Sequence, residues 1–303
     1  MRLKDIGEVR LIESFARTLS LDRSVVKGSG DDAAVVKYSR DKYLLLTCDM
    51  VIEGVHFRIR GTDPFRIGWK AMARNISDIA AMGGLPRYAM VSMAMDPNLS
   101  VAFARRLVRG MNAVSKKFGV NIVGGDVSRS KKLVIVISLT GEVRKDKVVF
   151  RSGAKTGDAI LLTGSIGGSG KGKHLDFIPR VAEARQLVNR FKINSMIDVS
   201  DGLAMDLWRI LKASSAGAVI YENAVPLSKE AGSFKEAISE GEDFELLFTM
   251  SAKEAKRLLS TRLKKIGTPI TVIGEVTGMS SGYRLVDSEG KIKRLGPYGY
   301  AHF

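Results

Sequence analysis

Hydrophobic residues recur along the first half of the chain with two spacings, one typical of helices and one typical of strands. Helical spacing predicts helices over residues 5–20, 64–82 and 100–118. Asp63 before Pro64 is a typical helix start, and Gly83 with Gly84 is a typical helix end. Runs of aliphatic and β-branched residues predict strands over 34–36, 43–48, 88–95, 120–123 and 133–140.

The second half continues this irregular alternation. Strands are predicted over 159–163, 195–199, 218–221, 244–250, 271–276 and 283–286. Helices are expected over 177–191, after a cap at Ser200 or Asp201, over 228–238, and from a capping box at Ser251 and Glu254 to about residue 265. Such an order indicates α+β or α/β layering. A charged turn near residue 146 suggests two domains, 1–146 and 147–303.

Composition narrows the class of protein. A chain of 303 residues exceeds what one hydrophobic core usually holds, and 45% hydrophobic with 26% charged residues is typical of a globular protein. No apolar run approaches the roughly 18 residues that cross a bilayer. The N-terminus lacks a secretory signal pattern, so we expect a cytoplasmic protein. Cys48 is the only cysteine, which argues against an internal disulfide and a cysteine-based zinc site.

The formal net charge of +16 raises the possibility of a polyanionic partner. The basic residues are scattered, however, in short pairs such as Lys116 with Lys117 and Lys131 with Lys132. None of these pairs belongs to a basic run interleaved with aromatic residues. A solvated surface is therefore the favoured interpretation, and a nucleic-acid-binding module is the alternative from a different class of function.

A glycine-rich stretch, GSIGGSGKG at 164–172, superficially suggests a P-loop. Its spacing does not fit, because five residues separate Gly164 from Gly170 where the motif has four. Gly172 also occupies the position where Ser or Thr must bind magnesium. A loop that is flexible or that approaches a phosphate stays open.

Several acids stand beside glycine or small residues, mostly where strands are predicted to end: Asp31, Asp32, Asp49, Asp126, Asp198, Asp201, Glu242, Asp243 and Glu245. Each has an ordinary structural explanation when taken singly. Asp78, within a predicted helix, has one too, an ion pair with Arg74 one turn earlier. Gathered at one sheet edge, however, the acids would repel one another unless cations neutralised them. Oxygen ligands without His or Cys favour Mg²⁺, whose natural companion is a nucleotide.

Seven motifs resemble those of the thiamine-monophosphate kinase family, in family order along nearly the whole chain. They are GSGDDAAVV (28–36), TCDMVIEGVHF (47–57), NISDIAAMGG (75–84), GGDVSRS (124–130), RSGAKTGD (151–158), IDVSDGL (197–203) and GEDFELLF (241–248). Shorter versions of several occur in the wider superfamily of aminoimidazole ribonucleotide synthetase, selenophosphate synthetase and the hydrogenase maturation carbamoyl-dehydration protein. The combination of EGVHF, SDGL and GEDFEL favours the kinase, and another ATP-dependent member of the superfamily is the nearest alternative.

This resemblance implies a two-domain aminoimidazole ribonucleotide synthetase-like fold. The N-terminal sheet would form a barrel with the sheet of a second copy in a homodimer, and a C-terminal α/β sandwich would close over ATP. The implied activity is ATP-dependent phosphorylation of thiamine monophosphate to the diphosphate by direct in-line transfer. The phosphate acceptor is already mostly dianionic at neutral pH, so no catalytic base is assigned.

The resemblance also assigns site residues by motif position. Several Mg²⁺ ions would be bound by Asp32, Thr47, Cys48, Asp49, Asp78, Asp126, Asp198 and Asp201. ATP would contact Gly125, Asp126, Arg151 and Ser200, and thiamine monophosphate would contact His56, Glu242 and Tyr300. Cys48 departs from the family, which usually has a hydroxyl residue there, so we expect its backbone carbonyl rather than its thiol to serve. His174 receives no role, and His302 is assigned to packing.

Overall fold

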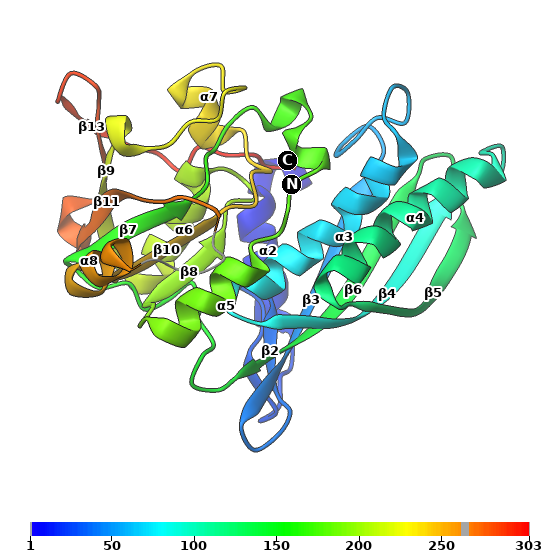
Figure 1. The fold of residues 1–303 in the computed structure, drawn as a ribbon, viewed down its shortest axis with the longest axis horizontal. Helices are drawn as coiled ribbons and strands as arrows, with labels where there is room; N and C mark the ends of the chain where they lie inside the picture. The colour runs from blue at the N-terminus through cyan, green and yellow to red at the C-terminus, as the bar shows by residue number, and fades with distance from the viewer. Residues whose placement is uncertain (1, 262–266, 303) are drawn as a thin grey trace.

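The computed structural model describes residues 2–261 and 267–302, which form two β-sheets with helices packed against them (Figure 1). The first sheet has six strands in the order β1-β2-β3-β6-β4-β5, and the second has seven in the order β13-β12-β9-β11-β7-β10-β8. The two chain ends lie close together, and the His302 backbone N–H donates to Glu8 Oε2 at 2.9 Å. Among the described residues no helix has the length and hydropathy needed to cross a membrane.

Among the residues that the structure describes, helices cover only one face of the first sheet. Its strands are β1 (Val25–Lys27), β2 (Ala34–Lys37), β3 (Lys42–Ile52), β4 (Leu85–Met95), β5 (Asn121–Arg129) and β6 (Val134–Arg144). The preceding and connecting helices are α1 (Leu3–Ile6), α2 (Glu8–Thr18), α3 (Pro64–Ala81) and α4 (Val101–Phe118). On β3, Leu45 and Val51 are buried toward α3, whereas Leu46 and Met50 are exposed on the opposite face.

The second sheet is covered on both faces. Its strands are β7 (Asp158–Thr163), β8 (Ser195–Asp198), β9 (Ala216–Tyr221), β10 (Leu246–Ser251), β11 (Ile270–Gly278), β12 (Tyr283–Val286) and β13 (Ile292–Arg294). Its helices are α5 (Val181–Arg190), α6 (Leu203–Ser214), α7 (Phe234–Ser239) and α8 (Ala252–Ser260). The residues of strand β10 are mostly apolar, without alternation, because its side chains are buried on both faces of the sheet.

One hydrophobic core joins the two halves of the molecule. It extends from α3 and α4 through α5 to one face of β10, while a second core lies between the other face of that sheet and α6. Two hydrogen bonds reinforce the junction: Trp69 Nε1 donates to the Phe177 carbonyl, and the Arg185 guanidinium donates to the Gly83 carbonyl, each at 2.9 Å. The halves are therefore held in a fixed relation around α3.

The start and end of α3 are confirmed. Asp63 caps the helix by accepting a hydrogen bond from the Phe65 backbone N–H at 2.9 Å, with Pro64 in the first position. Gly83, directly after the helix end, has φ of 72°, in the region that favours glycine. The predicted cap of α8 is also confirmed, with Ser251 accepting from the third backbone N–H of the helix, and Ser100 caps α4 in the same way.

Other boundaries differ from the predictions. The first helix is interrupted at Gly7, where φ is 76°. The helix predicted over 177–191 begins at Val181, and the one predicted over 228–238 is reduced to α7. Strands β1 and β13 were not predicted because each is very short. The predicted helix end near residue 265 lies outside the described residues, and the domain boundary near residue 146 stays a prediction.

The predicted cap of α6 is wrong. Gly202 occupies the capping position, and neither Ser200 nor Asp201 supplies a side-chain bond. Instead, Asp206 in the first turn accepts from the backbone N–H groups of Asp201 and Gly202, at 2.9 and 3.1 Å. The side chain of Asp201 is thereby free for another contact.

Helices α3 and α4 cross with almost no space between their backbones. A Cβ atom added at Gly110 would lie 1.9 Å from the Phe65 carbonyl oxygen, and one added at Gly68 would lie 2.0 Å from the Leu107 carbonyl oxygen. These distances are too short for any side chain. Glycine at both positions therefore sets how closely α4 holds α3 against the sheet.

We predict that Gly110→Ala lowers the free energy of unfolding by about 1–3 kcal/mol, because the helices must separate to admit the methyl group. Chemical denaturation monitored by circular dichroism measures this change. Gly278→Ala is the matched control, since its added Cβ meets nothing closer than 3.9 Å. Equal stability of the Gly110 variant and the control would contradict the close crossing.

Candidate active site

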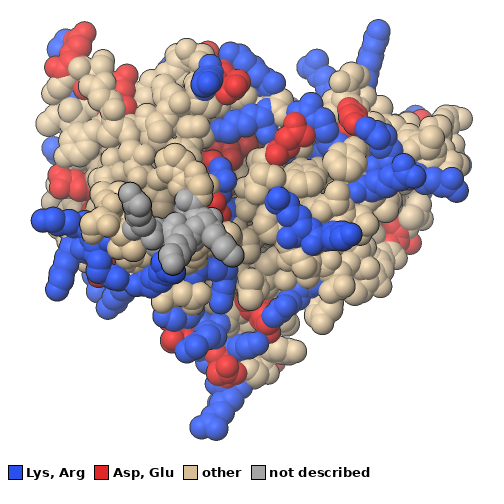
Figure 2. Space-filling view, viewed as in Figure 1, with Lys and Arg blue, Asp and Glu red and all other residues tan. Residues whose placement is uncertain are grey.

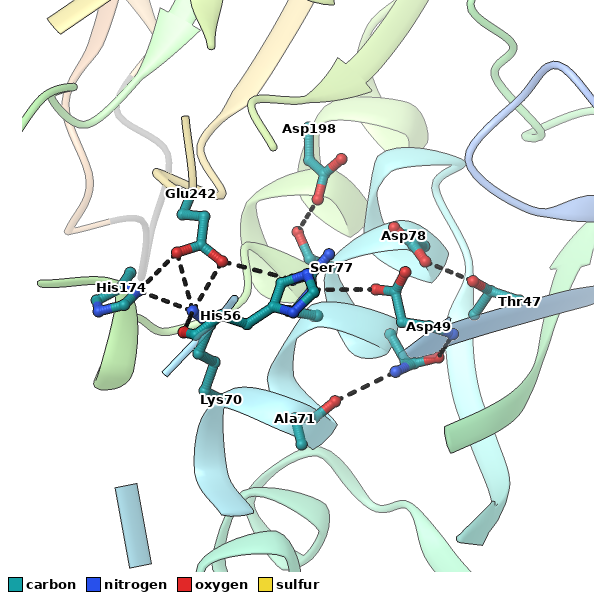
Figure 3. Close-up of polar contacts among 12 residues, drawn as sticks. Thr47, Asp49, His56, Lys70, Ala71, Ser77, Asp78, His174, Asp198 and Glu242 are labelled. Atoms are coloured by element: carbon teal, nitrogen blue, oxygen red, sulfur yellow. Dashed lines mark hydrogen bonds and ion pairs between the residues drawn. The ribbon is translucent and has the colours of Figure 1, made fainter. Parts of the chain in front are cut away.

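Helix α3 presents a polar stripe on an otherwise apolar surface. Lys70, Arg74 and Asp78 follow one another at intervals of four residues, and Ser77 lies beside them. Residues with this spacing share one helix face. Because α3 lies at the junction of the two halves, this face meets side chains from both (Figure 3).

Three carboxylates gather at one end of the stripe. Carboxylate oxygens of Asp32, Asp78 and Asp198 all lie within 4.8 Å of one another. They come from the turn before β2, from α3 and from the last residue of β8, so both halves of the molecule contribute. The structure thus brings these three of the predicted acids together, and their binding of metal stays a prediction.

Hydrogen-bond donors hold each member of this acid cluster. The Arg151 guanidinium donates to Asp32 Oδ1 at 2.7 Å, and the Ser77 hydroxyl donates to Asp198 Oδ2 at 2.5 Å. The Thr47 hydroxyl donates to Asp78 Oδ2. Thr47 thus faces the cluster from β3, where its side chain points toward α3.

The cluster has the electrostatics of a cation site. Burial, followed by the charges of neighbouring aspartates, raises the pKa of Asp78 well above its usual value. Burial and the charge of Asp32 likewise raise the pKa of Asp198. Among the described residues, the buried Oδ2 atom of Asp32 has no hydrogen-bond partner. Several carboxylate oxygens, one of them unpartnered, fit a hard divalent cation such as Mg²⁺.

Asp49 and Arg74 lie beside this cluster. The Arg74 guanidinium contacts Asp49 Oδ2 and Glu242 Oε1, each at 3.4 Å. The alternative in which Arg74 pairs with Asp78 on the helix surface is therefore not what the structure shows. The prediction that Asp49 ends a strand is also wrong: β3 continues to Ile52, because its whole length pairs with β6.

A second polar cluster surrounds Lys70 at the other end of the stripe. The fully buried Lys70 ammonium contacts Glu242 Oε1 at 2.7 Å and donates to the His56 carbonyl at 2.6 Å. His174 Nδ1 lies 2.7 Å from Lys70 Nζ and 2.6 Å from Glu242 Oε2. Glu242 has a φ of 57°, unusual for a residue other than glycine, so its backbone is held in a strained conformation.

The charges within this second cluster depend on one another. Burial opposes ionisation of Glu242, but the contacts with His174 and Lys70 outweigh it and lower its pKa to about 2. Burial lowers the pKa of Lys70 to about 8, against the opposing attraction of Glu242. Burial and the charge of Arg74 lower the pKa of His56 to about 4, so this imidazole is neutral at pH 7.

The C-terminal tail reaches the same region. The Tyr300 backbone N–H donates to the Asp201 carbonyl at 2.9 Å, while the Asp201 carboxylate pairs with Arg209. The His302 ring lies 5.0 Å from the Tyr300 ring and 5.4 Å from the His56 ring. The tail thus brings together His56 and Tyr300, two predicted substrate contacts from distant parts of the chain, and the His302 ring packs between their rings.

Cys48 lies on the opposite face of the first sheet. Because side chains alternate along β3, Cys48 points away from α3 while Thr47 and Asp49 point toward it. Its thiol accepts a hydrogen bond from the Ser138 hydroxyl at 3.4 Å. Within one chain, this thiol is therefore turned away from the acid cluster.

Gly125 and Asp126 lie on the edge strand β5, away from the cluster. Pairing across the sheet puts Asp126 in one row with Ser92, Val136 and Met50, so it is three strands from β3, about 14 Å. The prediction that Asp126 follows a strand is wrong, since β5 continues to Arg129. Gly125 itself lies against the Val91 backbone, where an added Cβ would be 1.7 Å from the carbonyl oxygen.

Sequence reasoning missed two members of the site, Lys70 and His174. The signal for Lys70 was present, because a helix of mostly apolar residues carries Lys70, Arg74 and Asp78 on one face. Nothing local marks His174, which lies in a 3₁₀ turn (Lys173–Leu175) after the glycine-rich loop. Ser200, which was predicted to contact ATP, meets the Lys70 cluster through its backbone. Its carbonyl accepts a hydrogen bond from the Glu242 backbone N–H at 2.7 Å.

Comparison with known proteins agrees with this architecture. The AIR synthase related protein N-terminal domain matches residues 30–143, and the corresponding C-terminal domain matches residues 155–287. The two halves of the chain are thus the two domains of an AIR synthase-related protein. Hydrogenase maturation protein HypE in complex with ATP, at 22% identity and a TM-score of 0.71, shares this fold.

Relatives of higher identity define the family. Thiamine-monophosphate kinase of Rhodopirellula baltica is 38% identical over 94% of each chain, and that of Bacillus subtilis is 35% identical over 98% of this chain and 100% of its own. The structure of AaThiL complexed with AMPPCP and TMP has 30% identity and a TM-score of 0.86, covering 100% of this chain and 99% of that one. The chain belongs to the thiamine-monophosphate kinase family.

The acid cluster predicts how Mg²⁺ and charge affect stability. In metal-free buffer at neutral pH, Asp78→Asn should unfold at the same temperature as the wild type or higher, because one of three repelling charges is removed. Excess Mg²⁺ should raise the unfolding temperature of the wild type and raise that of the variant much less. Differential scanning calorimetry measures both effects.

Asp146→Asn is the control for this prediction, since Asp146 is an exposed acid that pairs with Arg144. Its response to Mg²⁺ should equal that of the wild type. An equal Mg²⁺ response from the Asp78 variant would show that the ion binds elsewhere.

The contacts of the Lys70 cluster predict that removing the Lys70 ammonium causes a large loss of stability. Lys70→Met should lower the free energy of unfolding by about 3 kcal/mol, because the Glu242 carboxylate loses its buried partner. Adding Glu242→Gln should recover part of that loss in a double-mutant cycle, measured by urea unfolding. Lys212→Met, which breaks an exposed pair with Glu13, should cost less than about 1 kcal/mol. Similar losses at the two lysines would contradict the account.

Proposed function

We propose that this protein catalyses ATP-dependent phosphorylation of thiamine monophosphate to thiamine diphosphate, with release of ADP. The convergence of Asp32, Asp78 and Asp198 between the two halves carries the proposal, because such a cluster suits the meeting of two phosphate-bearing substrates. Thiamine-monophosphate kinases that match nearly the whole chain support the choice of acceptor. A cytoplasmic location belongs to the same proposal.

Several Mg²⁺ ions belong to the proposed reaction. Asp32, Asp78 and Asp198 would hold them, with Thr47, Asp49, Asp126 and Asp201 and the Cys48 carbonyl as further proposed ligands. When bound, Mg²⁺ neutralises phosphate oxygens and relieves the repulsion between the two polyanions.

The chain's own residues orient the substrates. Arg151, held by Asp32, would place positive charge at the nucleotide, with Gly125, Asp126 and Ser200 as further proposed ATP contacts. Neutral His56, ionised Glu242 and the Tyr300 ring would recognise the cationic, aromatic part of thiamine. The acceptor phosphate is mostly dianionic at neutral pH, so it attacks without a general base, and no phospho-enzyme forms.

A homodimer is also proposed. The uncovered face of the first sheet exposes apolar side chains, namely Leu46, Met50, Tyr88 and Met90. Next to it, all nine residues of the edge strand β5 are exposed. Apolar faces and unpaired edges of this kind are typical contact surfaces. A second copy that covered this face would complete the barrel implied by the family resemblance.

The surface charge does not favour the nucleic-acid alternative. Lys and Arg side chains are spread over the face seen in Figure 2, with Asp and Glu among them, rather than gathered in one stripe. A dispersed charge of this kind matches a solvated surface.

The proposed reaction requires three components together. We expect ADP release only when ATP, Mg²⁺ and thiamine monophosphate are all present, and thiamine diphosphate should form in equal amount, measured by chromatography. Asp78→Asn should abolish turnover while circular dichroism shows the fold intact, and Asp146→Asn should keep wild-type activity. ADP release without the acceptor would refute the proposal, and so would full activity of the Asp78 variant.

A further inference from the structure

We propose that Arg74 binds the phosphate of the acceptor and the phosphoryl group that it receives. This inference rests on the function proposed above and adds to it a residue that contacts the reacting atoms. The Arg74 guanidinium on α3 would then distinguish a phosphorylated acceptor from its unphosphorylated alcohol.

The position of Arg74 along α3 supports this role. One turn before it, Lys70 holds Glu242 and the His56 carbonyl, the proposed contacts of the thiamine rings. One turn after it, Asp78 belongs to the acid cluster. Figure 3 shows Glu242 and His56 toward one end of this helix face and Asp78 toward the other. The acceptor phosphate must lie between the ring portion of its molecule and the nucleotide, which is the span that Arg74 occupies.

The contacts of Arg74 leave it able to bind an anion. Its Nε and Nη1 atoms meet Asp49 and Glu242 at 3.4 Å, longer than the 2.7 Å between Arg151 and Asp32. Charge-assisted hydrogen bonds are normally about 2.7–2.9 Å long, so the Arg74 contacts are loose. No described residue accepts a hydrogen bond from its Nη2 atom. Since a guanidinium has five N–H donors, most of those of Arg74 are available to phosphate oxygens.

The charge of Arg74 is also not needed for Glu242. Lys70 contacts that carboxylate at 2.7 Å and His174 at 2.6 Å, which are both much closer than Arg74. The Arg74 side chain is only 16% exposed, so an anion that meets it is poorly screened by water. The Phe244 ring, 5.9 Å from the guanidinium carbon, limits where the guanidinium can move.

In the transfer, an acceptor phosphate oxygen forms a bond to the γ-phosphorus of ATP as the bond from that phosphorus to the bridging oxygen of ADP breaks. The bonding electrons leave with ADP, and no proton moves because the attacking oxygen is already anionic. Arg74 remains protonated throughout. Its planar donors would contact oxygens of the acceptor phosphate and of the phosphoryl group in flight.

Steady-state kinetics of Arg74→Gln test the inference. We expect kcat/KM for thiamine monophosphate to fall about 1,000-fold, the lower end of what an arginine supplies in phosphoryl transfer, with KM for ATP unchanged. Arg74→Lys should recover part of the loss, because it restores the charge without the planar donors. Arg257→Gln is the matched control: Arg257 also pairs with an acid, Glu254, and lies over a phenyl ring, but on α8 outside the site.

Binding measurements separate a phosphate contact from a structural role. By calorimetry, the wild type should bind thiamine monophosphate more tightly than thiamine, and Arg74→Gln should lose this preference while its affinity for thiamine is unchanged. An equal loss of affinity for both ligands would overturn the inference, as would full kcat/KM in this variant. If Arg74→Gln does not fold, Arg74→Lys takes its place: a partial loss of the preference for thiamine monophosphate is then expected, and an undiminished preference or full kcat/KM would overturn the inference. Absence of acceptor-dependent ADP release in the wild type would instead refute the proposed function.

Discussion

Electrostatic repulsion among three carboxylates is the constraint that the packing of the rest of the structure has to withstand. Asp32, Asp78 and Asp198 come from three separate elements of both halves. In the described part of the chain, only Arg151 places a full positive charge in direct contact with one of them. Such a cluster persists only where surrounding packing holds it. The continuous core through α3 and α5 and the close crossing of α3 with α4 provide that support. The packing thus holds together charges whose repulsion a bound cation would relieve.

Much of the fold was predictable because its signals are local. Asp63 with Pro64 and the pair Gly83 and Gly84 define the helix that carries Asp78, and each acts on the backbone within a few residues of itself. Strand lengths were less predictable, since they depend on distant partners. Strand β3 extends past Asp49 because β6 pairs with it along its whole length. Asp126 lies within β5 for a similar reason, through its pairing with β4.

For the site, too, features that depend on neighbouring residues were predictable, and features that depend on distant residues were not. Individual acids were identifiable from the residues around them, and their order along the chain resembled one family. The Lys70 cluster could not be identified from the sequence, because Glu242 and His174 meet Lys70 only after the two halves pack together. Helix α3 therefore connects the two parts of the proposed site, with Asp78 in the acid cluster toward one end and Lys70 beside the proposed thiamine contacts toward the other. Arg74 lies between them, in the span that we propose for the transferred phosphoryl group.

The central claim is that the three carboxylates bind divalent cations between the two substrates. Crystals grown with a non-hydrolysable ATP analogue, thiamine monophosphate and Mn²⁺ in place of Mg²⁺ test it most directly through anomalous scattering. We predict a Mn²⁺ peak within coordination distance of Asp32, Asp78 and Asp198, next to the nucleotide phosphates. An ordered nucleotide with no Mn²⁺ peak at these three residues would contradict it.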